Sequence, residues 1–266
     1  MSPRRSTTLA LIIDPDQVSI QILRDHLRLM WSYEVHWSTT EQHAWELCKT
    51  LSPALIFMDL RSPAFDGLRF TRELRRSYLC CRQAPVIVSS WEPKASDTLA
   101  ARDVGAHEFM RKPFSLKQVN QRIDAVTKRK REWIEGVNYV GPDRRWFNSG
   151  QTQGARRRRT DQDLSPERVR IAQALKIIKV AIDSIESDPL QAFRAIKAQA
   201  ENLQDAAVVA ADFGLAGAAK SLREHLDSAA QKGRFAGKEL VDGIEGVFTA
   251  SRTTPPQRRQ SIHWID

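Results

Sequence analysis

The sequence contains few cysteines and no long hydrophobic segment. Its 266 residues include only three cysteines, at positions 48, 80 and 81. Three cysteines cannot build a disulfide framework, and their spacing is not that of a metal site. The longest apolar runs, such as residues 9–13 and 54–58, are far shorter than the roughly 20 residues that span a bilayer. Because the first run is also too short for a secretion signal, we expect a cytoplasmic protein.

The excess of positive charge lies mainly in one short segment. Hydrophobic residues make up 41% of the chain and charged residues 27%, so the chain can bury at least one sizeable core. Residues 128–161 contain ten basic and four acidic side chains, which gives them a net +6 out of +9 for the whole chain. A uniformly basic nucleic-acid-binding domain is therefore not indicated.

Apolar runs alternate with helix-like stretches through the first half of the chain. Five runs are expected to be strands, at residues 9–13, 34–37, 54–58, 85–89 and 107–111. The first, third and fourth are almost continuously apolar, as expected of parallel strands that are buried on both faces. The pattern predicts an α/β fold with a five-stranded, doubly wound parallel sheet over residues 8–131. Ligands of such sheets bind outside the carboxyl ends of the strands.

The composition changes after residue 131. Residues 132–163 contain four glycines and an arginine run at 156–159, and we expect a basic linker without a core of its own. From Leu164 the apolar residues recur at helical spacing, and Ser165 followed by Pro166 is a typical helix start. Four helices with short turns predict an all-α bundle over residues 164–250. A mobile tail at 251–266 is expected to follow.

Four polar residues follow predicted strands, at the point where each strand ends. They are Asp14, Asp59, Ser90 and Lys112. Because the carboxyl ends of parallel strands meet at one edge of the sheet, these side chains should share a site. Carboxylates bind Mg²⁺, and one of them can act as a nucleophile and form an aspartyl phosphate. The lysine and the hydroxyl complement the oxygens of a phosphoryl group.

Two further segments match the loops around this edge. They are Asp59-Leu60-Arg61-Ser62-Pro63 with Asp66-Gly67, and Gly105-Ala106 with Lys112-Pro113-Phe114. With these motifs, residues 8–131 resemble a response-regulator receiver domain of two-component signalling.

The resemblance implies a role for each site residue. Asp59 would accept the phosphoryl group, Lys112 would pair with that group, and Ser90 would be the switch hydroxyl. Phe109 falls where the family has its rotating aromatic switch residue. A magnesium ion would be held by Asp14, Asp59 and the backbone carbonyl of Arg61.

Two positions depart from the family pattern. The family usually has two adjacent acids after the first strand, whereas this chain reads Asp14-Pro15-Asp16. Asp16 could substitute, but one residue further on it should point elsewhere, and the loss of a carboxylate should weaken the metal site. Trp91 follows Ser90, where the family commonly has a small residue. We therefore keep a non-phosphorylated pseudo-receiver, used for docking only, as an alternative.

The bundle offers no chemistry of its own. Residues 162–250 carry 11 basic and 13 acidic side chains, and this net −2 disfavours a DNA-recognition helix. The bundle loosely resembles a degenerate histidine-phosphotransfer domain, but its one histidine, His225, lacks the lysine and small residue that should follow. The expected partners are thus a histidine kinase or phosphotransfer protein and a downstream protein target. A homodimer is left open, and the protein is not expected to be an enzyme in the usual sense.

The basic linker supports a rival hypothesis. Its arginines are interleaved with aromatic residues, which suits contacts with phosphates or single-stranded nucleic acid. The arginines in question are Arg144, Arg145, Arg156, Arg157, Arg158 and Arg159. This hypothesis predicts binding to nucleic acid that weakens steeply with salt. Because no folded reading module accompanies the arginines, a solvated or protein-binding tether is preferred, and a membrane role is not expected.

Overall fold

The computed structural model describes residues 8–63, 65–129, 131–144, 165–232 and 238–251. The chain divides into two compact units. The first comprises residues 1–134 with 139–155, and the second comprises residues 135–138 with 156–266. None of the helices in the described residues is long and apolar enough to cross a membrane.

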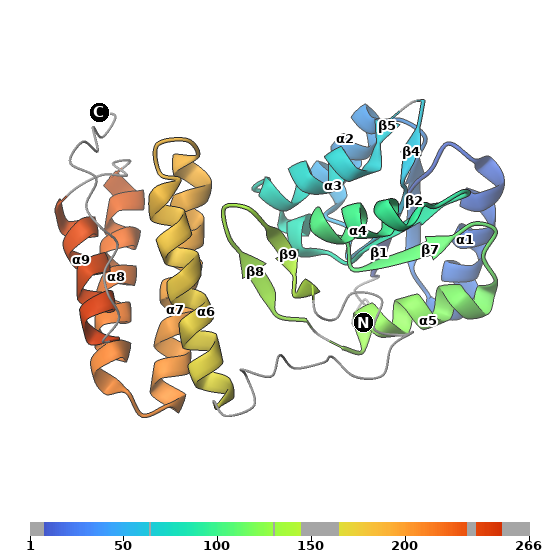
Figure 1. Cartoon of the computed structure of the whole chain (residues 1–266). Helices are drawn as coiled ribbons and strands as arrows, with labels where there is room; N and C mark the ends of the chain where they lie inside the picture. Colours follow the sequence, from blue (N-terminus) through green and yellow to red (C-terminus); the bar gives the residue numbers. More distant parts are fainter. Residues whose placement is uncertain (1–7, 64, 130, 145–164, 233–237, 252–266) are drawn as a thin grey trace, which may run out of the picture. The chain divides into compact units, whose positions relative to one another are not determined.

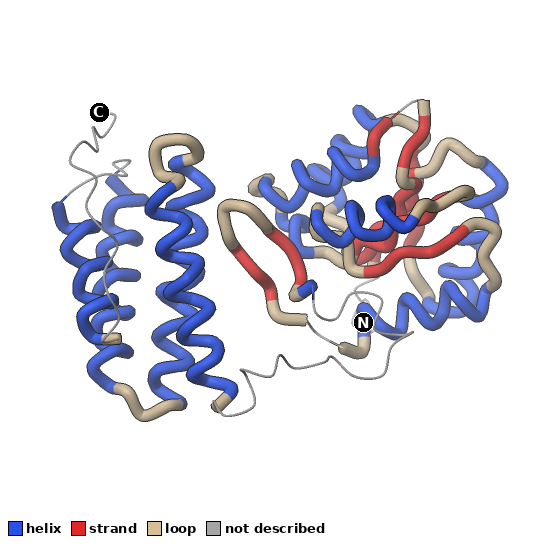
Figure 2. The backbone as a smooth tube through the Cα atoms, in the orientation of Figure 1, coloured by secondary structure: helices blue, strands red, loops and turns tan. Residues whose placement is uncertain are grey.

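The first unit is built on the predicted parallel sheet (Figures 1 and 2). Five strands pair side by side, all parallel, in the order β2-β1-β3-β6-β7. Their bounds are Leu9–Ile13 for β1, Glu34–Ser38 for β2, Leu55–Asp59 for β3, Val86–Ser90 for β6 and Glu108–Arg111 for β7. A short antiparallel pair, Arg61–Ser62 (β4) with Phe65–Asp66 (β5), follows β3. The predicted fold class is confirmed.

Helices cover both faces of this sheet. Helices α1 and α5 pack on one face through residues such as Leu23 and Ile123, while α2, α3 and α4 pack on the other through residues such as Cys48, Phe70 and Ala101. The helices span Gln17–Trp31 (α1), Glu41–Leu51 (α2), Gly67–Arg76 (α3), Ala95–Asp103 (α4) and Leu116–Thr127 (α5), and Cys80–Gln83 form a 3₁₀ turn. Since β1 and β3 are covered on both sides, their continuous apolar runs are accounted for.

The segment after α5 differs from the linker that we expected. Helix α5 ends at Thr127 rather than near residue 131, and Trp133–Glu135 (β8) pairs with Val140–Pro142 (β9). Arg131 fixes the start of this hairpin, because it donates to the His107 carbonyl at 2.7 Å and forms an ion pair with Glu108. The sequence did not reveal this hairpin for a physical reason. Arginine side chains hold the segment by binding a carbonyl and a carboxylate of the sheet, and such contacts need no hydrophobic pattern in the sequence.

A close backbone approach joins this hairpin to the sheet. Gly105 has φ +95°, a left-handed conformation that favours glycine, and a Cβ there would lie 2.6 Å from the Val140 carbonyl oxygen. Arg144 lies over the Tyr139 ring at 4.2 Å and pairs with Asp103 at 2.9 Å. Residues 139–144 therefore belong to the first unit.

A buried arginine ties together the amino ends of β6 and β7. Arg75, at the end of α3, is only 1% exposed. It donates to the carbonyl oxygens of Gly105 at 2.9 Å, Arg82 at 2.6 Å and Ala84 at 2.9 Å. Its fourth contact is His107 Nδ1 at 3.3 Å. Burial lowers the pKa of Arg75 to about 9, so the guanidinium stays charged at neutral pH.

The buried imidazole of His107 predicts a loss of stability in acid. Burial, with Arg75 and Arg131 nearby, holds the pKa of His107 well below its usual range. Below about pH 6.5 the unfolded chain binds a proton that the folded chain does not, so stability should fall by up to about 1.4 kcal/mol per pH unit. Urea unfolding followed by tryptophan fluorescence should show this fall between pH 7.5 and 5.

The control for this prediction is His107→Asn, which keeps an acceptor near the Nδ1 position but cannot titrate in this range. Its free energy of unfolding should depend less on pH than that of the wild type over the same interval. An equal slope in both proteins would contradict the assignment to His107.

The second unit contains the predicted bundle (Figure 1). Its helices are Pro166–Asp183 (α6), Pro189–Val209 (α7), Phe213–Lys232 (α8) and Lys238–Ala250 (α9), and each packs against the next. Ser165 caps α6 as expected, and Asp188 caps α7. The core is rich in alanine and leucine, with Ile178, Ala195, Leu203, Leu222 and Val247 among its fully buried residues. The predicted helices are confirmed.

Residues 135–138, predicted to be linker, are part of this second unit. Val137 joins the core of the bundle. Gln191 donates to the Glu135 carboxylate at 2.9 Å and to the Gly136 carbonyl at 3.2 Å, and Gln199 donates to the Glu135 carbonyl at 3.1 Å. The second unit therefore includes residues 135–138 in addition to the helices that begin after the expected boundary at residue 164.

Candidate functional site

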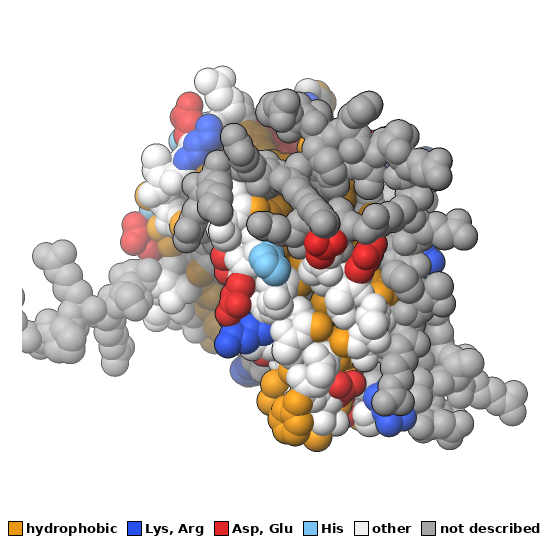
Figure 3. Space-filling view, turned by 90° about the vertical axis from the view of Figure 1, so that its left-hand side faces the viewer, with side chains coloured by type: hydrophobic (Ala, Val, Ile, Leu, Met, Phe, Trp, Pro, Cys, Tyr) orange, Lys and Arg blue, Asp and Glu red, His pale blue; other side chains and the backbone are white. Residues whose placement is uncertain are grey.

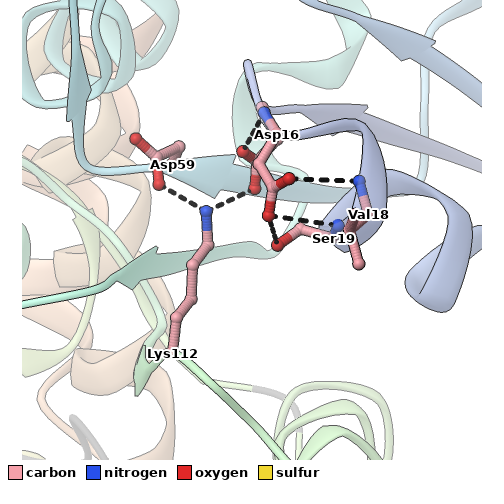
Figure 4. A network of polar contacts seen from close by, with 6 residues as sticks. Asp16, Val18, Ser19, Asp59 and Lys112 are labelled. Atoms are coloured by element: carbon pink, nitrogen blue, oxygen red, sulfur yellow. Dashed lines mark hydrogen bonds and ion pairs between the residues drawn. The ribbon is translucent and has the colours of Figure 1, made fainter.

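The predicted polar residues do meet at the carboxyl edge of the sheet. Asp14 directly follows β1, Asp59 ends β3, Ser90 ends β6 and Lys112 directly follows β7. Since β1 and β3 pair in register, as do β3 and β6, the strand ends lie next to one another. Figure 4 shows Asp59 and Lys112 facing each other across this edge.

Lys112 joins the two carboxylates. Its Nζ donates to Asp14 Oδ2 and to Asp59 Oδ1, in both cases at 2.6 Å. All three side chains are buried: Lys112 is 1% exposed, Asp14 2% and Asp59 5%. A buried ammonium that is shared by two carboxylates stabilises both of them and leaves one net negative charge in the site.

Asp14 has a second fixed contact. Its Oδ1 accepts a hydrogen bond from the backbone N–H of Asp16 at 2.9 Å. Burial raises the pKa of Asp14, although the hydrogen bond from Lys112 opposes this effect. Both oxygens of Asp14 are therefore oriented before any ligand binds.

Asp16 is occupied elsewhere (Figure 4). It is the N-cap of α1, and its carboxylate accepts from the N–H groups of Val18 at 3.1 Å and Ser19 at 3.3 Å. It also accepts from the Ser19 hydroxyl at 2.7 Å, and this bond is the main reason why its pKa is lowered. Asp16 thus does not replace the carboxylate that is absent at Pro15, as its position one residue further on suggested.

The remaining predicted residues lie around this centre. The Ser90 carbonyl accepts from the Lys112 N–H at 2.7 Å, so the two strand ends are joined through their backbones. Phe109 is buried on β7, in the core that α3 and α4 cover. The Arg61 side chain points to α4, where its guanidinium pairs with Asp97 at 3.3 Å.

Comparisons with known proteins decide the family of this unit. The family model described as "Response regulator receiver domain" matches residues 10–124. Residues 10–124 form a response regulator receiver domain.

The receiver is similar to about half of the length of each of two known regulators. The alkaline phosphatase synthesis transcriptional regulatory protein PhoP of Bacillus subtilis is 27% identical over 119 residues, 45% of this chain and 48% of that protein. The transcriptional regulatory protein SrrA of Staphylococcus aureus is 29% identical over 119 residues, 45% of this chain and 47% of that protein. The chain thus spans about half the length of these curated relatives.

Solved structures of response regulators are similar to a little under half of this chain. A putative response regulator from Chloroflexus aurantiacus is 23% identical, covers 47% of this chain and 100% of its own, and gives a TM-score of 0.42. A two-component response regulator from Clostridium difficile is 20% identical, covers 46% of this chain and 98% of its own, and gives a TM-score of 0.43.

The donors in the receiver fit a magnesium ion with two carboxylate ligands. One carboxylate oxygen of Asp14 and one of Asp59 both contact Lys112 Nζ, so the two oxygens lie close enough to bind one cation. Mg²⁺ is commonly bound through one or two carboxylates together with waters and phosphate oxygens. Among the described residues no group of three or more acidic, histidine or cysteine side chains could hold a metal. Asp14 and Asp59 therefore supply the two carboxylates that such a site needs.

The candidates outside the receiver centre are only partly described. Arg144 is engaged with Asp103 and Tyr139, while Arg145 and residues 156–159 lie outside the described residues, as does most of the tail at 251–266. His225 lies on α8, where its Nδ1 is buried and has no hydrogen-bond partner in the described part of the chain. Figure 3 views the molecule from the left-hand side of Figure 1 and shows acidic side chains on that face. Val208, Val209 and Phe213 are exposed at the turn between α7 and α8.

Proposed function

We propose that the receiver accepts a phosphoryl group on Asp59 from a phosphorylated histidine of a histidine kinase or phosphotransfer protein. The carboxylate oxygen attacks phosphorus, the phosphorus–nitrogen bond breaks, and the imidazole leaves with its electron pair and takes up a proton. This is a two-component signalling reaction, and we place the protein in the cytoplasm with its kinase.

The contact of Lys112 with both carboxylates carries this proposal. Lys112 Nζ lies 2.6 Å from Asp59 and is buried, so it is placed to neutralise a phosphoryl oxygen on that side chain. Asp14 orients the ammonium from the other side. Ser90 is the last residue of the neighbouring strand, and its hydroxyl would donate a hydrogen bond to a second phosphoryl oxygen. A Mg²⁺ ion held by Asp14, Asp59 and the Arg61 carbonyl would neutralise the remaining charge of the phosphoryl oxygens.

The consequence of phosphorylation is proposed to be a change in protein contacts. Movement of Ser90 toward the phosphoryl group and rotation of Phe109 would alter the surface made by α4, β7 and α5. The chain continues from α5 into the segment fixed by Arg131. The helical unit would then bind a downstream protein differently in the two states.

A mass measurement tests the proposal. The full chain is incubated with acetyl phosphate and Mg²⁺, and we expect its mass to increase by one phosphoryl group. Asp59→Asn should abolish the increase because the nucleophile is lost, whereas Asp25→Asn, an exposed aspartate on α1, should not change it. If the wild type takes up nothing at high donor and high Mg²⁺, the receiver is a docking module only.

A further inference from the structure

An indole lies beside the buried lysine of the candidate site. Trp91 follows Ser90, the last residue of β6, and its ring centroid lies 5.8 Å from Lys112 Nζ. This is the same nitrogen that contacts Asp14 and Asp59. Trp91 is 52% exposed whereas Lys112 is 1% exposed. The indole thus has one part near the buried ammonium and the other part in solvent.

We propose that Trp91 is a lid that keeps water away from phosphorylated Asp59 and so lengthens the lifetime of the phosphorylated receiver. The proposal rests on the proposed function, since it concerns the stability of the product at Asp59. Trp91 is a positioning residue in this account and takes no part in the transfer of the phosphoryl group.

The attraction between the ring and the ammonium favours this position of the indole. A cation is attracted to the face of an aromatic ring, and the attraction is stronger when the cation is desolvated. Lys112 is desolvated, since it is only 1% exposed.

A second contact involves the loop that follows Asp59. Arg61 lies two residues after Asp59 and pairs with Asp97 of α4 at 3.3 Å. This ion pair ties the loop after β3 to the helix that follows Trp91 in the chain. Because Arg61 is largely exposed, the pair is weak and the indole remains the stronger element.

The chemistry of hydrolysis explains the effect of a lid. Water attacks phosphorus opposite the Asp59 oxygen, the bond between them breaks, and the electron pair stays on the carboxylate. Inorganic phosphate leaves, and the water loses a proton to the solvent. Asp59 and Lys112 are buried and Trp91 is half-exposed, so we place the indole on the path by which water from the solvent would reach the phosphorus.

The lid should slow hydrolysis more than phosphorylation. A phosphohistidine donor approaches from the same side, but its protein brings binding energy that can displace the indole. A single water molecule brings no such energy. The arrangement therefore favours gain of the phosphoryl group over its spontaneous loss.

Three variants of the full chain test the proposal. Each protein is phosphorylated with acetyl phosphate and Mg²⁺ and freed of donor, and the phosphorylated fraction is followed by mass spectrometry. Trp91→Ala should shorten the lifetime by roughly tenfold, which corresponds to about 1.4 kcal/mol in the barrier to hydrolysis. Trp91→Phe keeps an aromatic face over Lys112 and should restore most of the lifetime. Trp37→Ala removes an indole of the same kind, which lies 5.5 Å from Arg24 and outside the site, and should leave the lifetime unchanged.

The outcomes separate the lid from the function on which it rests. Urea unfolding should show that Trp91→Ala is still folded and unfolds in one cooperative transition, so that a shorter lifetime reports on the site and not on loss of the fold. Uptake with equal lifetimes in the wild type and Trp91→Ala, or equal shortening in Trp91→Ala and Trp37→Ala, overturns the lid alone. A wild type that takes up no phosphoryl group overturns both the lid and the proposed function.

Discussion

A receiver in which Arg75 is replaced by methionine is expected to lose about 3 kcal/mol of its free energy of unfolding. The guanidinium contacts the carbonyl oxygens of Arg82 and Ala84, which lie in one segment of the chain, and that of Gly105, which lies in another. Methionine fills much of the volume but donates to none of them, and each buried carbonyl left without a donor costs about 1–3 kcal/mol. Removal of a desolvated cation offsets part of this cost.

Urea unfolding of the full chain at neutral pH measures this loss. Arg72→Met, an exposed arginine one turn earlier on α3, is the matched control and should change stability by less than about 0.5 kcal/mol. Arg75→Lys should fall between the two, because one ammonium cannot reach all the carbonyls. Equal stabilities of Arg75→Met and Arg72→Met would show that the carbonyls find other donors.

The sheet and the centre of the site could be predicted from the sequence because both follow from short-range patterns. Continuous apolar runs such as Leu9–Ile13 mark strands that are buried on both faces, and strict alternation with helices fixes a parallel sheet. Parallel strands then bring their carboxyl ends together. For this reason Asp14, Asp59 and Lys112 meet although they are far apart in the chain.

The hairpin after α5 and the buried Arg75 could not be predicted in the same way. Arg131 and Arg144 contact backbone carbonyls and single carboxylates of the first unit, and such contacts leave no hydrophobic periodicity in the sequence. Nothing in the spacing of the apolar residues of α3 distinguishes Arg75 from an arginine on the surface. Its burial depends on carbonyls that only the folded chain brings together.

The role of Asp16 had a signal that sequence reasoning undervalued. An aspartate directly before an amphipathic stretch is typical of a helix N-cap. The structure shows this cap, in which Val18 and Ser19 occupy the carboxylate of Asp16. The substitution at Pro15 is therefore not compensated by its neighbour.

Replacing Lys112 by methionine should destabilise the receiver by about 3–5 kcal/mol in the absence of divalent metal. Asp14 and Asp59 would then face each other without the ammonium that contacts both, and loss of one partner from a buried ion pair has a cost of this size. Lys117→Met, an exposed lysine on α5, is the matched control and should have little effect.

Mg²⁺ should restore much of that stability, because the ion and the ammonium compete for the same two carboxylates. In the wild type, the metal must displace Lys112 from Asp14 or Asp59. A ligand at roughly 100 times its Kd stabilises a protein by ~2.7 kcal/mol when nothing competes with it, so Mg²⁺ at such a concentration should stabilise the wild type by less than this amount. In Lys112→Met no competitor remains, and the gain should be larger. Urea unfolding of both proteins with and without Mg²⁺ measures the difference. If Mg²⁺ stabilises Lys112→Met no more than the wild type, the two carboxylates do not form a shared cation site, and the ammonium is not what limits metal binding.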